Sequence, residues 1–254
     1  MSNDSSGLRS TGKFVDIQSA QSGSLVQKTM HKIAALIRDD KLRVGDQLPS
    51  EGALVDAMEV SRTVVRESIG ALAALGIVDV GNGRKPRVAA ATAFPFIMSL
   101  AHSAQTGQIT VQQIWEARSC IEVKTGTLAA GFRTEAQAEQ LLELARRMAD
   151  CDDHGDPMTR LEIEFHSLIA VASRNILFEH LLASFAPLMA SAVPAAWSTR
   201  HTAAEQREVV QNHVNIAIAI AKRNPKATAK AMELHFDRAI DYLVQARYEP
   251  PFGI

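Results

Sequence analysis

The stretch 45–88, GDQLPSEGALVDAMEVSRTVVRESIGALAALGIVDVGNGRKPRV, contains two short helical patterns followed by two strand-like runs around a Gly-rich turn. Ser50 can cap a first helix that ends near Met58, and Ser61 can cap a second helix after a tight connection. This order of elements predicts a winged helix-turn-helix, a motif that places its second helix in the major groove of DNA.

The second predicted helix has an apolar side and a basic side. Val65, Ile69 and Leu72 recur at i, i+4 and i+7, so they would face a core. The N-terminal residues of a recognition helix reach base edges and phosphates, and arginine offers paired donors to guanine. The candidate DNA contacts of this helix are therefore Ser61, Arg62, Thr63 and Arg66.

A basic hairpin is predicted after the second helix. Strands are expected at 77–80 and 84–89, joined by the turn Gly81-Asn82-Gly83. The second strand brings Arg84, Lys85 and Arg87 close to the turn. Alone, such a hairpin would be an ordinary solvated surface, but after a helix-turn-helix it is better interpreted as a wing that grips phosphates or the minor groove.

Four short segments carry a family resemblance: LPSE (48–51), VSRTVVRE (60–67), LGIV (75–78) and GNG (81–83). Their joint pattern and spacing resemble the DNA-binding domain of the GntR family of bacterial transcription regulators. The resemblance to FadR-like members implies DNA contacts from Ser61, Arg62, Arg66, Asn82 and Gly83. The family commonly has an arginine directly after LPSE, whereas this chain has Gly52.

The composition is that of an ordinary globular protein large enough for two cores. The net charge is only −1, so the local placement of arginines, and not the overall charge, favours nucleic-acid binding. Residues 1–22 are rich in Ser and Gly and lack an apolar segment, which predicts a disordered leader without a signal peptide. No apolar run long enough to span a membrane is expected, and two cysteines give no disulfide framework, so we expect a cytoplasmic protein.

Helical patterns account for most of the remaining chain. A capping box of Ser24 and Gln27 begins a helix that ends near Asp39, within a DNA-binding domain at 23–90. An all-α helical-bundle domain is expected at 94–248, with caps at Thr134, Asp156 and Asn224. Its predicted helices span 95–104, 110–131, 134–150, 157–173, 176–190, 203–223 and 225–247.

Four side chains of this second domain are expected to converge. Glu162 and His166 are four residues apart and therefore leave the same side of one helix. His213 and His235 lie at nearly equal distances from the turn at Asn224, about 16 Å along each helix. If those two helices pack antiparallel, three imidazoles and one carboxylate can hold a divalent transition metal such as Zn, Ni, Mn or Fe. The alternative is that these histidines are ordinary surface or core residues.

The region 94–248 also resembles the FCD ligand-binding domain of FadR-like GntR regulators. That resemblance implies a metal site formed by Asp-x-x-x-His and two later histidines, with Glu162 in the place of the usual Asp. It also implies that Arg118, in the segment Glu116-Ala117-Arg118, contacts the carboxylate of an effector; the alternative is a surface salt bridge. His31, His102, His154, His180 and His201 fit no such pattern and are taken as structural.

Two classes of function follow from these patterns. The first is a homodimeric transcription regulator that binds an inverted-repeat DNA operator under the control of a small carboxylate or sugar-acid effector. The second is a helical-bundle metalloenzyme in which the Glu162, His166, His213 and His235 site activates water. A regulator that has lost its metal and binds effector through Arg118 alone is a third possibility. No nucleophile–base pair or Gly-rich phosphate loop accompanies the metal candidates, which favours the regulator.

Overall fold

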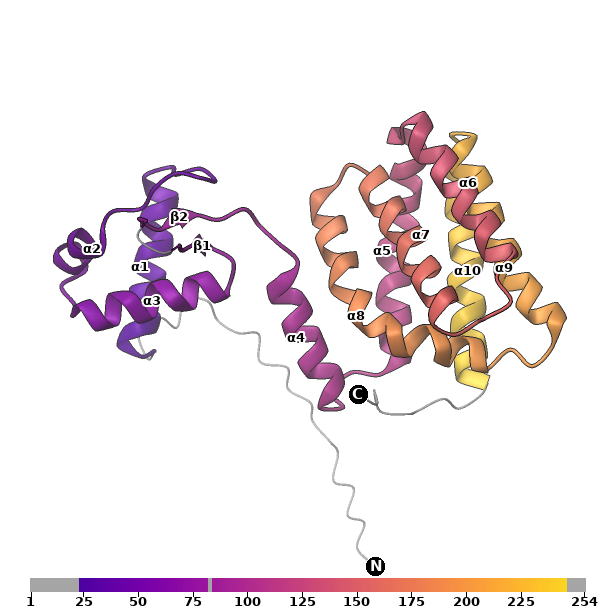
Figure 1. The fold of residues 1–254 in the computed structure, drawn as a ribbon, viewed down its shortest axis with the longest axis horizontal. Helices are drawn as coiled ribbons and strands as arrows, with labels where there is room; N and C mark the ends of the chain where they lie inside the picture. Colours follow the sequence, from indigo (N-terminus) through magenta and orange to yellow (C-terminus); the bar gives the residue numbers. More distant parts are fainter. Residues whose placement is uncertain (1–22, 82–83, 246–254) are drawn as a thin grey trace, which may run out of the picture. The chain divides into compact units, whose positions relative to one another are not determined.

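The computed structural model describes residues 23–81 and 84–245, in which it has ten helices and two short strands (Figure 1). The chain divides into two units, residues 1–91 and 92–254. The predicted fold class, a winged helix-turn-helix followed by an all-α domain, is confirmed. The leader predicted at 1–22 and the wing residues Asn82 and Gly83 lie outside the described residues.

The first unit is built on three helices and a small sheet: α1 Leu25–Asp39, α2 Glu51–Met58, α3 Arg62–Ala74, β1 Val78–Asp79 and β2 Arg87–Val88. The helix α1 packs against α3, and α2 packs against α3 as a helix-turn-helix. Ile33, Leu54 and Val65, one from each helix, are fully buried in a shared core. That core fixes which side of α3 remains exposed.

The wing strands are shorter than the sequence predicts. β1 and β2 pair antiparallel over two residues each, with Val78 opposite Val88 and Asp79 opposite Arg87. Pro86 has no N–H group, so the ladder cannot continue through it towards the turn. Its carbonyl instead accepts a hydrogen bond from the backbone of Leu48, at 2.8 Å. The base of the wing is thereby tied to the segment that precedes α2.

Helix caps hold most boundaries where the sequence places them. Ser24 and Thr134 each form the predicted capping box with the glutamine three residues later. Asn224 accepts a hydrogen bond from the backbone of Ala227, at 3.0 Å, as a cap does. The predicted cap at Asp156 is wrong: Gly155 is the N-cap, and Asp156 is the first helical residue, where its charge suits the helix dipole.

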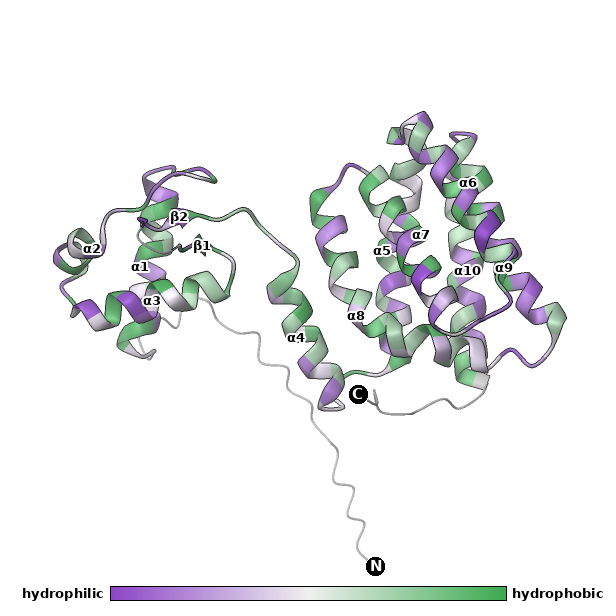
Figure 2. Ribbon diagram, in the orientation of Figure 1, coloured by the Kyte–Doolittle hydropathy of each residue, from purple (hydrophilic) through white to green (hydrophobic). Residues whose placement is uncertain are grey.

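Up to residue 245, where the described part of the second unit ends, its regular elements are all helices: α4 Phe94–Gln105, α5 Val111–Phe132, α6 Glu135–Ala149, α7 Asp156–Ala172, α8 Ile176–Ser198, α9 Ala203–Ala221 and α10 Pro225–Gln245. α5 packs against α7 and α10, α9 packs against α6 and α10, and α8 packs against α4 and α7. Each of these helices carries both hydrophobic and hydrophilic residues (Figure 2), so each has an apolar side that can be buried. The buried sides of α5, α7, α9 and α10 therefore meet in one core, which includes the fully buried Phe165 and Phe236.

The helix α8 is longer and more apolar than expected. It was predicted to end near residue 190, but it continues through Pro187 and Pro194 to Ser198. By length and composition alone, this helix is long and apolar enough to cross a membrane. It is the one such helix in the described residues. The expectation of no apolar segment of membrane-spanning length is therefore wrong. Its Leu188 and Val193 belong to the core of the second unit, so burial accounts for part of its apolar composition.

Candidate metal and effector site and DNA-binding surface

The start of α3 presents its polar side chains to solvent. Ser61 caps the helix and accepts a hydrogen bond from the backbone of Val64, at 3.3 Å. Arg62, Thr63 and Arg66 are all exposed, whereas Val65, on the other side of the helix, is fully buried. The predicted reading residues thus lie together on the free surface of the second helix of the motif.

Two of the predicted DNA-contact arginines carry surface ion pairs. Arg66 Nε lies 3.8 Å from Glu51 of α2, and Arg84 Nη2 lies 2.8 Å from Asp79 of β1. Exposed pairs of this kind contribute little to stability, about 0–1 kcal/mol. Neither pair is therefore an obstacle to a phosphate that approaches the same arginine.

Arg87 has a structural contact at the base of the wing. Its guanidinium donates a hydrogen bond to the carbonyl of Gly45, at 2.7 Å, and so braces the base of the wing. Gly52, where GntR proteins commonly carry an arginine, lies in the first turn of α2, and a Cβ built there meets only the Ser50 hydroxyl, at 4.0 Å. The backbone there leaves space for a longer side chain.

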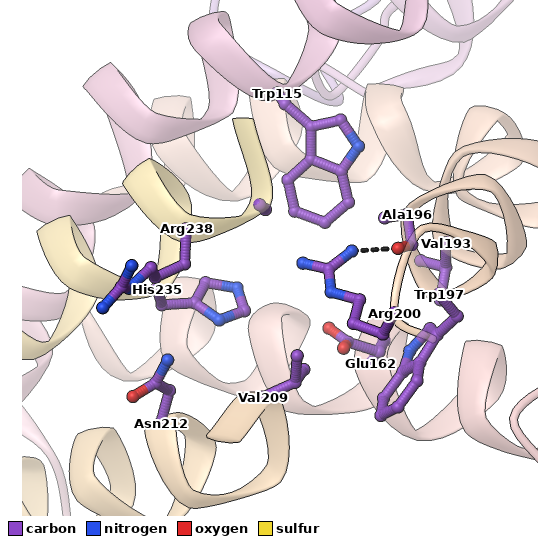
Figure 3. A pocket seen from close by; sticks show the side chains of 11 residues that line it. Trp115, Glu162, Val193, Ala196, Trp197, Arg200, Val209, Asn212, His235 and Arg238 are labelled. Carbon is purple, nitrogen blue, oxygen red and sulfur yellow. Dashed lines mark hydrogen bonds between the residues drawn. The ribbon is translucent and has the colours of Figure 1, made fainter. Parts of the chain in front are cut away.

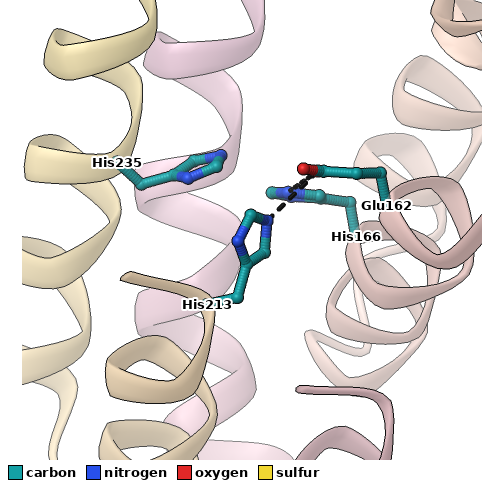
Figure 4. Close-up of side chains that lie close together, drawn as sticks. All are labelled: Glu162, His166, His213 and His235. Atoms are coloured by element: carbon teal, nitrogen blue, oxygen red, sulfur yellow. Dashed lines mark hydrogen bonds and ion pairs between the residues drawn. The ribbon is translucent and has the colours of Figure 1, made fainter. Parts of the chain in front are cut away.

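The four predicted metal ligands come together in the second unit (Figure 4). Glu162 and His166 come from α7, His213 from α9 and His235 from α10, and one candidate ligand atom of each lies within 4.8 Å of the others. All four side chains are buried. The antiparallel packing of α9 and α10 produces this convergence and places the rings of His213 and His235 4.5 Å apart.

Hydrogen bonds set the orientation of two of the histidine rings. His166 Nδ1 is hydrogen-bonded to the carboxylate of Glu122, and His213 Nδ1 donates to the carbonyl of Val209, at 2.9 Å. Each contact occupies Nδ1 and leaves Nε2 directed at the cluster, the arrangement in which a metal-ligating histidine is held by a second group. Glu162 Oε2 lies 3.1 Å from His213 Nε2 and 3.5 Å from His166 Nε2.

The ionisation of two of the four candidate ligands, Glu162 and His235, suits a cation. Burial disfavours the charged form of Glu162, but the neighbouring His213 and His166 outweigh it and hold the pKa of this carboxyl well below its usual range. Burial, and then the two other histidines, lower the pKa of His235 well below its ordinary value. At neutral pH the site therefore offers a carboxylate and a neutral imidazole, the forms that bind a metal.

Unpartnered nitrogen atoms provide a test of the fit to a metal. Within the described residues, Nε2 of His166 and Nε2 of His235 are buried and have no hydrogen-bond partner. A buried polar atom without a partner is costly, and such atoms in a native structure call for an explanation. A divalent ion bound by Glu162, His166, His213 and His235 would supply a partner to both nitrogens.

Arg118 lies beside this cluster but is not free. It is 4 % exposed, and its Nε donates a 2.6 Å hydrogen bond to Glu122, the residue that also holds His166. Its guanidinium stacks over the ring of Trp115, 4.9 Å from the ring centre. Arg118 is thus a salt-bridge partner, as the alternative interpretation expected, but the pair is buried and does not lie on the surface. Glu122 is not among the residues predicted from the sequence, although its position four residues after Arg118 places the two on one side of a helix.

A small cavity lies on another side of the cluster (Figure 3). Glu162 and His235 line it together with Trp115 and Arg200, two residues that the sequence analysis did not select. Arg200 follows the end of α8, in the connection to α9, where no helical spacing relates it to the other site residues. The periodicity of the sequence therefore could not predict that Arg200 lies near the other site residues.

Comparison with known proteins assigns both units. Residues 25–88 match the model of the bacterial regulatory proteins of the gntR family, and residues 113–238 match the FCD domain. The chain belongs to the GntR family. It is a transcription regulator that joins a GntR helix-turn-helix to an FCD domain, and the metalloenzyme alternative has no support from these matches.

Curated relatives and a solved structure agree with this assignment. The chain is 28% identical over 211 residues to the HTH-type transcriptional regulator LutR of Bacillus subtilis (82% of this chain, 96% of the relative). It is 27% identical over 209 residues to the Glc operon transcriptional activator of Escherichia coli K12 (80% and 82%). The structure of Streptococcus agalactiae GntR is similar, with a TM-score of 0.56, 26% identity and coverage of 85% of this chain and 99% of that one.

Proposed function

We propose that this GntR regulator binds an inverted-repeat operator as a cytoplasmic homodimer and that a small organic acid, bound beside a metal in the FCD domain, controls its affinity for the operator. The proposed binding of metal and effector rests on one observation, a buried cluster of four potential metal ligands: Glu162, His166, His213 and His235. The exposed Arg62 and Arg66 of α3 support the DNA-binding half.

The metal in this proposal is a divalent transition ion such as Zn, Ni, Mn or Fe, because imidazole and carboxylate ligands suit these ions. When bound, it would provide a positive centre for a carboxylate of the effector. Glu122 holds the Nδ1 side of His166, which keeps Nε2 directed into the site. We propose that Arg118, whose guanidinium fork fits a carboxylate, contacts the effector from the Glu122 side.

Control of DNA binding requires that the effector prefers one arrangement of the dimer over another. A ligand shifts such an equilibrium only by its differential affinity for the two states. In this proposal the bound acid changes the spacing of the two recognition helices in the dimer, and half-site spacing in the operator selects that arrangement.

The deciding experiment is metal analysis of protein purified without chelator, compared with His213→Ala and His235→Ala. We expect about one ion per chain in the wild type and a marked loss in both variants, since each removes one of four ligands. His180→Ala, which changes a half-buried histidine of α8 outside the cluster, is the matched control. If the wild type holds no metal under any supplementation, or if both ligand variants keep it fully, the metal site is rejected.

Effector control is tested separately, by operator binding in the presence of a panel of sugar acids and small carboxylates. We expect at least one acid to change operator affinity, and His235→Ala to abolish that change while leaving effector-free DNA binding intact. An operator affinity that no member of the panel alters would count against control by an organic acid.

A further inference from the structure

Arg200 extends from the end of α8 into the small cavity beside the metal cluster, hereafter the Arg200 cavity (Figure 3). The cavity also receives Trp115 from α5, Glu162 from α7 and His235 from α10. It has a volume of about 20 Å³, enough for about one water molecule. Two of the four candidate metal ligands thus share a wall with a buried arginine.

Three residues that line this cavity carry nitrogen atoms without a hydrogen-bond partner. Trp115 Nε1, Arg200 Nε and His235 Nε2 are all buried and have no hydrogen-bond partner within the described residues. Trp115 Nε1 and Arg200 Nε are N–H donors under all ordinary conditions. A metal would satisfy His235, but the two N–H groups require an acceptor, and an anionic oxygen is the acceptor that an arginine binds most strongly.

Arg200 differs from Arg118 in its charge compensation. Arg118 is paired with Glu122 at 2.6 Å, whereas no carboxylate of the described residues lies within 4 Å of Arg200. The guanidinium of Arg200 is held by the carbonyl of Ala196 and the hydroxyl of Thr199 and lies over the ring of Tyr242. These contacts orient the group without neutralising it, although only 6 % of the residue is exposed.

The charges around the site favour a dianion. Over the buried region as a whole, the charges of Glu122 and Glu162 equal those of Arg118 and Arg200, although neither carboxylate pairs with Arg200. A divalent ion at the cluster would therefore leave two positive charges in this region. Uncompensated buried charge is strongly unfavourable. A monocarboxylate effector would remove one of the two charges, and a dicarboxylate would remove both.

We propose that Arg200 binds an anionic group of the effector and that the effector is a dicarboxylate or an equivalent dianion. This inference rests on the proposed function of the FCD domain as an organic-acid sensor, and it adds the class of acid. One carboxylate lies at the metal cluster and the Arg118 side, and the second pairs with Arg200 and the N–H of Trp115.

Effector binding must enlarge the Arg200 cavity, because one water molecule occupies far less space than a dicarboxylate. Arg200 lies in the short connection between α8 and α9, whereas the other lining residues belong to helices. Trp197, at the end of α8, lines the cavity and stacks on His154, with ring centres 4.2 Å apart. The protein has two tryptophans, and both Trp115 and Trp197 line this cavity, so its fluorescence reports on occupancy.

The test compares acids that differ only in their second carboxylate. Succinate is paired with butyrate, and malate with 2-hydroxybutyrate, and each is titrated by calorimetry and by tryptophan fluorescence. We expect at least one dicarboxylate to bind the wild-type protein about tenfold or more tightly than its partner, as one lost charge-assisted contact implies. Metal content is measured on every sample.

Variants assign the preference to Arg200. Arg200→Gln should reduce the affinity for the dicarboxylate to that of its monocarboxylate partner, and Arg200→Lys should recover part of the difference. Arg207→Gln is the matched control, because Arg207 is an exposed arginine of α9 that does not line the cavity. It should leave the preference unchanged.

The inference is overturned if the wild type binds both members of each pair equally, or binds neither, or if Arg200→Gln keeps the preference. Circular dichroism and metal content show whether Arg200→Gln is folded, and the wild-type preference does not depend on any variant. A failure of the proposed metal site would give a different result from a failure of the Arg200 assignment. Protein without metal that still prefers the dicarboxylate through Arg200 would reject the metal site and retain the assignment of Arg200.

Discussion

Glu122 is the residue that links Arg118 to the metal cluster. It is 1 % exposed, and its two oxygens contact Arg118 and His166. Burial opposes its ionisation, but Arg118 and His166 outweigh burial and lower the pKa of this carboxyl. The same contact raises the pKa of His166 against the effect of burial, which marks a more basic ring and a better metal ligand.

Replacing Glu122 by glutamine should therefore weaken metal binding without removing a ligand. We expect the metal affinity to fall about 10–100-fold, the range found when partners that hold metal-ligating histidines are changed. Competition with a chelating dye measures this affinity. Glu116→Gln is the control, since Glu116 is exposed on the same helix. An unchanged affinity in Glu122→Gln would show that the contact does not support the metal.

Gly52 leaves the first turn of α2 without the arginine that GntR proteins commonly carry there. Gly52→Arg should raise operator affinity a few-fold and steepen its salt dependence by about one unit, as one added phosphate contact does. The open space around Gly52 permits the side chain. Gly52→Ala, which stabilises the helix without adding charge, separates the two effects. A salt slope that is identical for Gly52→Arg and Gly52→Ala would mean that this turn does not reach the phosphates.

The difference between Glu162 and Arg200 shows what the sequence can reveal at this scale. The spacing of Glu162 and His166, and of His213 and His235 about one turn, predicts their convergence, because helical geometry and antiparallel packing place them. Arg200 lies in a connection between helices, where the local sequence does not specify direction. Its role emerges only from the packing of α5, α7 and α10 around it.

At the scale of elements, α3 and the wing should act on DNA in different ways. Arg62→Ala should cost about 1–3 kcal/mol of operator binding and relax base preference, because an arginine that reads guanine loses paired contacts. Arg84→Ala should weaken all sequences evenly and reduce the salt slope by about one unit. Binding is measured against the operator and against variants of it at several salt concentrations.

Arg38→Ala provides the comparison for both changes, because Arg38 is an exposed arginine of α1 that is paired with Asp39. It removes the same charge from the same unit and should alter neither base preference nor the salt slope. An Arg62→Ala protein with wild-type affinity and base preference would remove Arg62 from the reading surface.

The sequence predicts the ends of a helix well where a capping residue determines them. It predicts them poorly where the packing of the helix against the core determines them. Capping boxes at Ser24 and Thr134 mark helix starts because the cap is a local hydrogen bond. The helix α8 passes through Pro187 and Pro194, which local propensity interprets as a stop. Burial of neighbouring apolar residues such as Leu188 and Val193 in the core compensates for the missing backbone donors.

At the scale of the whole molecule, the two units have separate hydrophobic cores. Each core closes within its own unit, and the four candidate metal ligands belong entirely to the second. Ligands that bind one folded unit stabilise that unit by mass action. Metal and operator DNA are therefore expected to act on different unfolding transitions of the same chain.

Calorimetry of the intact protein tests this separation. Removing the metal with a chelator should lower the melting temperature of the FCD transition by roughly 5–10 °C, the shift expected when an ion is present at about 100 times its Kd. The helix-turn-helix transition should not move, whereas operator DNA should raise it. His235→Ala should melt as the chelated wild type does and should not respond to chelator. A chelator that shifts both transitions together would show that the two units unfold as one, and one that shifts neither would show that no metal contributes to folding.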